Sequence, residues 1–134
     1  MACLSSRPSP HNHLLVGDKN GTLFLLDLAK KIVFSKKEIL AGHRVIHIAE
    51  SLTSDGEVTF STAAVVLNRH PKVHILRYMH GEQKLVSVFE LVLGENANKV
   101  EDIGKLPYAC QWEDYSRLLF VFTYDGTILL FRIP

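Results

Sequence analysis

Two segments near opposite ends of the chain repeat one another. Residues 20–28 and 125–133 each open with a polar residue followed by Gly and Thr, and each continues as a mostly apolar run. Asn-Gly and Asp-Gly tolerate the positive φ of a tight hairpin turn, and a second apolar run precedes each pair. Each segment therefore predicts a β-hairpin. A chain built from repeated hairpins needs neighbouring repeats to cover its apolar strands.

A third, weaker copy lies at residues 69–78, where Pro71 stands in place of Gly21 and Gly126. The copies are 50 and 55 positions apart, a spacing typical of blades with four strands. Further strands are predicted between the copies, at residues 32–40, 45–49, 57–67, 85–93 and 109–112. The apolar spacing of residues 45–52 would also suit a two-turn helix.

Several predicted strands are apolar at successive positions and not only at alternate ones. The segments at residues 58–67 and 117–123 contain such runs. Such runs are typical of strands that are covered on both faces, so these segments should lie between two layers of protein. Phe120 is accordingly predicted to be a buried core residue.

The chain resembles the WD40 family of β-propellers. The resemblance rests on Gly42-His43 at a repeat start, Asp125-Gly126-Thr127 at a hairpin, and Leu26-Asp27 in place of the family's Trp-Asp ending. It implies an all-β fold of antiparallel four-stranded blades, and for His43 a structural hydrogen bond. Three segments depart from the family's pattern: Leu76-Arg77, Phe131-Arg132 and Gly104-Lys105.

The predicted strands amount to about two and a half blades in residues 11–134, preceded by a flexible leader over residues 1–10. Closed propellers usually have at least four blades. The prediction is therefore an incomplete WD40-like propeller that needs further blades or another chain to close. A two-sheet β-sandwich also consists of several short strands and stays open as an alternative.

Composition excludes several classes of protein. Hydrophobic residues make up 47% and charged residues 22%, which is typical of a folded globular chain. The net charge of +1 argues against nucleic acid as a partner. The chain has neither a secretory signal pattern nor an apolar run long enough for a membrane helix. Cys3 and Cys110 are expected to be free thiols, which favours an intracellular, cytoplasmic location.

Candidate chemical groups give no enzyme signature. His43 and His47, like His70 and His74, are four positions apart, which suits zinc on a helix but spans about 13 Å on a strand. The adjacent carboxylates of Glu101-Asp102 and Glu113-Asp114 are expected to be solvated loop charges. Nucleophile-elbow and phosphate-loop motifs are absent from the sequence. No catalytic, cofactor-binding or metal-ligating residue is predicted.

Two surface features are candidate binding sites. Trp112 and Tyr115 could form a recognition surface, although Trp112 is more simply a packed strand residue. The cations Lys30, Lys31, Lys36 and Lys37 fit a solvated rim. The predicted function is a noncatalytic scaffold for protein partners, with no cofactor. The alternative is a small metal-binding or hydrolytic protein that uses its histidines.

Overall fold

The computed structural model describes residues 3–4, 13–28, 32–55, 58–79, 84–93, 103–113 and 117–134. This part of the chain forms three antiparallel sheets. Sheet A contains β1 (Cys3–Leu4), β2 (His13–Gly17), β3 (Thr22–Asp27) and β4 (Ile32–Glu38). Sheet B contains β5 (Val45–Asp55), β6 (Val58–Leu67), β7 (Lys72–Met79) and β8 (Lys84–Val92). Sheet C contains β9 (Pro107–Glu113), β10 (Leu118–Thr123) and β11 (Ile128–Arg132), after a single 3-10 turn at Ile103–Lys105.

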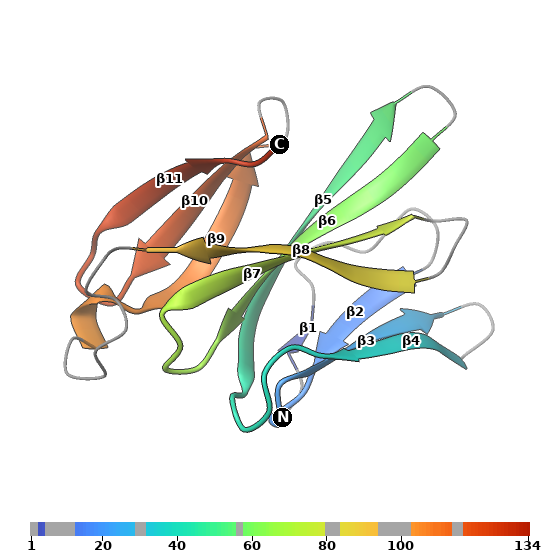
Figure 1. Cartoon of the computed structure of the whole chain (residues 1–134), viewed down its shortest axis with the longest axis horizontal. Coiled ribbons are helices and arrows are strands. Elements are labelled where there is room, and N and C mark those ends of the chain that lie inside the picture. Colours follow the sequence, from blue (N-terminus) through green and yellow to red (C-terminus); the bar gives the residue numbers. More distant parts are fainter. Residues whose placement is uncertain are drawn as a thin grey trace.

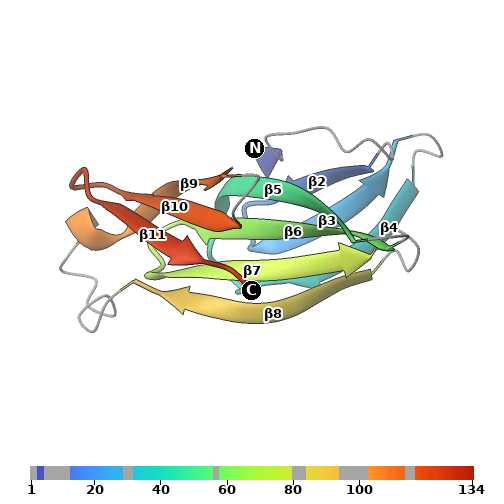
Figure 2. The ribbon, with the colours of Figure 1, turned by 90° about the horizontal axis from the view of Figure 1, so that it is seen from above.

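Strands that follow one another in the chain are neighbours in each sheet. Figure 1 shows sheet B between the other two, and Figure 2 shows β5 to β8 following one another across it. The predicted all-β architecture of successive antiparallel blades is confirmed. The helical alternative for residues 45–52 is wrong, because these residues pair with β6 as part of β5. Three sheets also exclude the two-sheet sandwich.

Sheet A starts inside the segment that was predicted to be a leader. In β1, Cys3 pairs with Gly17 and Leu4 pairs with Val16. A two-residue strand has no repeat motif or apolar run that would reveal it in the sequence. The other residues of the predicted leader, 1–2 and 5–10, lie outside the described residues.

Two apolar cores join the three sheets. The first packs sheet A against sheet B and includes Leu15, Leu25 and Tyr78. The second packs sheet B against sheet C and includes Val73, Trp112 and Leu119. In β6, residues 63, 65 and 67 belong to the first core, while residues 64 and 66 belong to the second. All five are 0% exposed, so β6 is covered on both faces as its unbroken apolar run predicts.

The hairpin turns explain the repeated glycines. Gly21 and Gly126 each have a φ of 85°, in the region that favours glycine. Pro71 cannot adopt such a value, because its ring fixes φ near −65°. The turn of sheet B instead places its positive φ of 54° on Arg69. Pro71 is therefore not the conformational equivalent of the two glycines, although the turn lies where the repeat predicts it.

Candidate functional site

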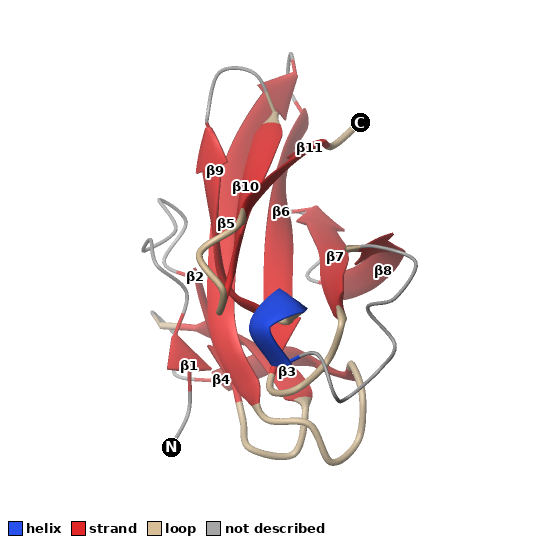
Figure 3. Ribbon diagram, turned by 90° about the vertical axis from the view of Figure 1, so that its left-hand side faces the viewer, coloured by secondary structure: helices blue, strands red, loops and turns tan. Residues whose placement is uncertain are grey.

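Exposed side chains on tight turns form one candidate interaction surface. We define the turn surface as Lys19, Asn20, Arg44 and Arg69, which are all exposed and lie in the connections of sheets A and B. Figure 3 shows most of the described loops toward the lower end of the molecule. Arginine on a well-supported backbone is common in binding hot spots. The turn surface could therefore bind an acidic region of another protein.

Backbone hydrogen bonds hold the turn surface in place. The Asp18 carboxylate accepts bonds from the backbone N–H groups of Asn20 and Thr22, each at 2.9 Å. The Asn68 N–H donates to the Arg44 carbonyl at 2.8 Å, and the Val45 N–H donates to the Asp18 carbonyl at 3.0 Å. These bonds link the turns of two sheets. The exposed cations are thus presented on a fixed backbone, which lowers the entropy cost of binding.

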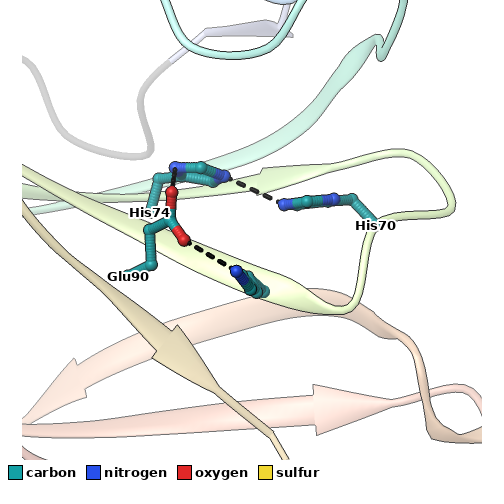
Figure 4. A network of polar contacts seen from close by, with 4 residues as sticks. His70, His74 and Glu90 are labelled. Atoms are coloured by element: carbon teal, nitrogen blue, oxygen red, sulfur yellow. Dashed lines mark hydrogen bonds and ion pairs between the residues drawn. The ribbon is translucent and has the colours of Figure 1, made fainter. Parts of the chain in front are cut away.

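A cluster of polar side chains lies beside this surface, and we call it the histidine cluster: His43, His70, His74, Lys72 and Glu90. Figure 4 shows the Nε2 atoms of His70 and His74 facing each other, and they are 3.1 Å apart. Glu90 lies on the other side of His74, with 3.8 Å between Oε1 and Nδ1. Its second oxygen accepts a hydrogen bond from Lys72 Nζ at 3.0 Å.

Burial and neighbouring groups keep both facing imidazoles neutral near pH 7. Partial burial, with smaller contributions from His74 and His43, lowers the pKa of His70 to about 4. Burial also lowers the pKa of His74, although the Glu90 carboxylate opposes this. The hydrogen bond from Lys72 lowers the pKa of the Glu90 carboxyl. One imidazole can therefore donate its N–H to the other.

The contact between His70 and His74 differs from the sequence expectation. A separation of about 13 Å assumed an extended strand between them. His70 instead lies in the turn before β7, and the turn brings its ring back beside His74. Even so, the described part of the chain gathers no group of three or more metal-ligating side chains that could hold a metal ion.

Substitution of His70 should change how stability depends on pH. In the folded chain its pKa is about 4, against 6.5 for the free side chain, so unfolding takes up a proton between these values. The stability that His70 contributes is present above pH 6.5 and is lost as the pH falls toward 4. Urea unfolding of His70→Gln should therefore lose less stability between pH 7 and pH 4.5 than the parent chain. Identical losses in the two proteins would contradict this prediction.

Two other histidines have structural hydrogen bonds. His43 Nδ1 donates to the Asn68 carbonyl at 3.0 Å, which fixes the turn of sheet B. His47 Nε2 donates to the Cys110 carbonyl at 2.9 Å and joins sheet B to sheet C. Cys110 is a free, buried thiol, and burial raises its pKa to about 12. This cysteine is not an activated nucleophile.

Trp112 also joins two sheets. Its indole N–H donates to the Ala49 carbonyl at 2.9 Å, and its side chain packs in the core between sheets B and C. The interpretation of Trp112 as a packed strand residue is therefore confirmed. Its suggested companion Tyr115 lies outside the described residues, as do Lys30, Lys31, Glu101, Asp102 and Asp114. Lys36 is exposed on β4, the outermost strand of sheet A, as expected for a solvated rim.

A small open cleft lies between sheets B and C. Arg77 and Arg117 line it. The Arg77 Nε donates to Thr62 Oγ1 at 3.3 Å, its guanidinium lies 5.4 Å from the centre of the Phe60 ring, and its Nη2 donates to the Pro134 carbonyl. Arg77 therefore stabilises the packing of sheets B and C. We interpret the arginine in this cleft as structural and not as a ligand-binding group.

Solved structures resemble this arrangement of sheets. The C-terminal WD40 domain of Sif2 matches 93% of the chain with a TM-score of 0.66 and 12% identity. A chain of the mitotic checkpoint complex matches 98% with a TM-score of 0.63 and 13% identity, and U3-55K matches 90% with a TM-score of 0.58 and 12% identity. The chain has the fold of WD40 β-propeller blades. The predicted WD40-like fold is thereby confirmed.

The WD40 match covers only part of each known propeller. The chain spans 32%, 35% and 34% of the Sif2, checkpoint-complex and U3-55K chains, about a third of each. No family profile and no curated protein sequence matches it. At this level of identity the WD40 likeness establishes the fold alone. In the described residues, no helix is long and apolar enough to cross a membrane.

Proposed function

We propose that the chain is a noncatalytic scaffold for protein partners and forms part of a larger β-propeller assembly inside the cell. The observation that carries this proposal is the turn surface, where Arg44 and Arg69 are exposed on a backbone fixed by hydrogen bonds. Interfaces are enriched in arginine, and preorganised groups lose little entropy on binding. The WD40 fold supports the proposal, since propellers present loops at their ends.

The chemistry of the other candidate groups also supports a scaffold without catalysis. His43, His47 and Trp112 are used in structural hydrogen bonds, and the thiol of Cys110 is buried. In the histidine cluster, His70 and His74 are joined to each other, and Lys72 is joined to Glu90, by hydrogen bonds within the chain. These assignments leave the alternative of a small metal-binding or hydrolytic protein without a specific observation in its favour.

Charge reversal on the turn surface tests the proposal. The chain and its Arg44→Glu/Arg69→Glu variant are compared by affinity purification from cell lysate after mild crosslinking, followed by mass spectrometry. Proteins with acidic surfaces should co-purify with the parent chain. The recovered amount of these proteins should fall at least about tenfold with the variant, because a loss of about 1.4 kcal/mol of binding free energy weakens binding tenfold.

Lys36→Glu is the matched control, because Lys36 is an exposed cation on β4 and lies outside the turn surface. It should retain the partners. Equal recovery of the same proteins with both variants, or no protein above background with the parent chain, would contradict a binding role for the turn surface.

A further inference from the structure

Each arginine of the turn surface is adjacent in sequence to a member of the histidine cluster. His43 precedes Arg44, and Arg69 precedes His70. The rings of the two histidines lie edge to face, with 5.5 Å between their centres. Both histidine side chains are half-buried, whereas both arginines are exposed. The two imidazoles therefore lie in contact with each other at the base of the two connections that present the arginines.

Glu90 sets the position of the protons in the pair of facing imidazoles. Its carboxylate oxygen lies 3.8 Å from His74 Nδ1, which favours a proton on that atom. In the bond of 3.1 Å between the two Nε2 atoms, His74 is then the acceptor and His70 the donor (Figure 4). The lone pair of neutral His70 consequently lies on Nδ1, the ring nitrogen that does not face His74.

His43 has a lone pair of the same kind. Its Nδ1 donates to the Asn68 carbonyl at 3.0 Å, so the lone pair of the neutral ring lies on Nε2. A proton added to this atom, or to Nδ1 of His70, creates a cation with a further N–H donor. It does not break the hydrogen bonds to Asn68 and His74. Each of the two connections can thus gain a positive charge while its backbone stays in place.

Burial and nearby cations keep His70 neutral in the chain by itself. Partial burial lowers its pKa most, and His74, His43 and Lys72 lower it further. The Glu90 carboxylate raises it, and the resulting pKa is about 4. The Lys72 ammonium already binds this carboxylate at 3.0 Å. An additional carboxylate beside the ring would raise the pKa of His70, because an opposite charge favours the protonated imidazole.

An acidic partner would supply that negative charge. Carboxylates bound by Arg44 and Arg69 would lie next to the residues that carry the two lone pairs. We propose that binding of an acidic partner at the turn surface is coupled to proton uptake by His43 and His70, so that the affinity rises as the pH falls. This inference deepens the proposed function, on which it rests, by assigning a regulation to the turn surface. The coupling is reciprocal, because a partner that favours protonation is itself bound more tightly by the protonated chain.

The affinity for an acidic peptide at several pH values tests the coupling. The probe is a peptide of about six aspartates with blocked termini, which stays mostly ionised at about pH 5 because the ordinary pKa of aspartate is about 3.9. Its dissociation constant should fall at least about threefold between about pH 7 and pH 5, since each proton taken up on binding changes the affinity by up to about tenfold per pH unit. Calorimetry of the parent chain in two buffers of different ionisation enthalpy should show net proton uptake. Circular dichroism checks that the chain is folded at each pH.

His43→Asn and His70→Gln remove the titrating nitrogens but keep the structural hydrogen bonds. The amide of asparagine can replace Nδ1 as the donor to the same carbonyl, and the amide of glutamine can replace Nε2 as the donor to the same imidazole. The double variant should lose most of the change in affinity with pH. His47→Gln is the matched control, because His47 lies in β5 and donates to the Cys110 carbonyl between sheets B and C. This control should keep the pH dependence of the parent chain.

An affinity that does not change with pH, or a change of equal size in the double variant, would overturn the inference. If Arg44→Glu/Arg69→Glu still abolishes binding in that case, the scaffold function stands and only its coupling to protons is rejected. A peptide that binds the parent chain at neither pH would contradict both the coupling and the recognition of acidic groups by the turn surface. Full binding by Arg44→Glu/Arg69→Glu would place the peptide elsewhere and reject both as well.

Discussion

Gly21→Val is expected to be the most damaging single substitution in the turns, with a loss of about 4 kcal/mol or more in the free energy of unfolding, at the extreme of what point substitutions cost. Gly21 has a φ of 85°, which a β-branched residue adopts only under strain. A Cβ atom there would also overlap with the Leu40 carbonyl oxygen and lie 2.8 Å from the His43 carbonyl oxygen. Those two groups are backbone and cannot rotate away.

Gly126→Val separates strain from steric overlap. Gly126 has the same φ of 85°, but apart from its two chain neighbours no residue has an atom within 4 Å of the position that its Cβ would occupy. Only the conformational cost of about 1–2 kcal/mol should then apply. Urea unfolding of both variants at one protein concentration measures the difference. Equal losses of unfolding free energy in the two variants would show that steric overlap with the Leu40 carbonyl does not add to the cost of a side chain at Gly21.

Leu119→Ala is expected to cost about 2–5 kcal/mol of unfolding free energy, whereas the adjacent Phe120→Ala should cost only about 1 kcal/mol. Leu119 is 0% exposed in the core between sheets B and C. Phe120 pairs with the exposed Leu130 on the face of sheet C opposite this core, and it is only half-buried. The smaller side chain should thus produce the larger loss.

Thermal or urea unfolding of the dilute chain measures these two substitutions. A larger loss of unfolding free energy for Phe120→Ala than for Leu119→Ala would contradict the prediction, because it would mean that the β10 face with Phe120 is the more deeply buried one.

Turn chemistry and apolar runs predicted most of this fold because both depend on local sequence. Asn20-Gly21 and Asp125-Gly126 encode their turns through the conformational freedom of glycine, and β6 encodes two covered faces through its unbroken apolar run. Burial of Phe120 was predicted wrongly for a physical reason. A strand next to a missing sheet has the same apolar pattern as a strand next to a present one, so sequence alone does not show which face is covered.

The candidate site was less predictable than the fold. The contact between His70 and His74 depends on the path of a turn in which Arg69 adopts a positive φ, and spacing along the chain does not reveal such a path. The turn surface has no sequence motif. Its arginines are candidates for binding because hydrogen bonds fix the backbone that carries them, and the sequence does not show those bonds. The sequence signal that could have marked it is a cation beside two of the three predicted hairpin turns, Lys19 and Arg69.

The double burial of β6 limits which mutations the chain can accept. Val65 faces the core shared with sheet A, and the adjacent Val66 faces the core shared with sheet C. This stretch has no solvent side on which a polar residue could be accommodated at low cost. A substitution that enlarges one side chain displaces the strand backbone toward the opposite core, so a compensating change would be needed in a different sheet. Variation should therefore be easier to introduce in the two end sheets than in the strand that both cores share.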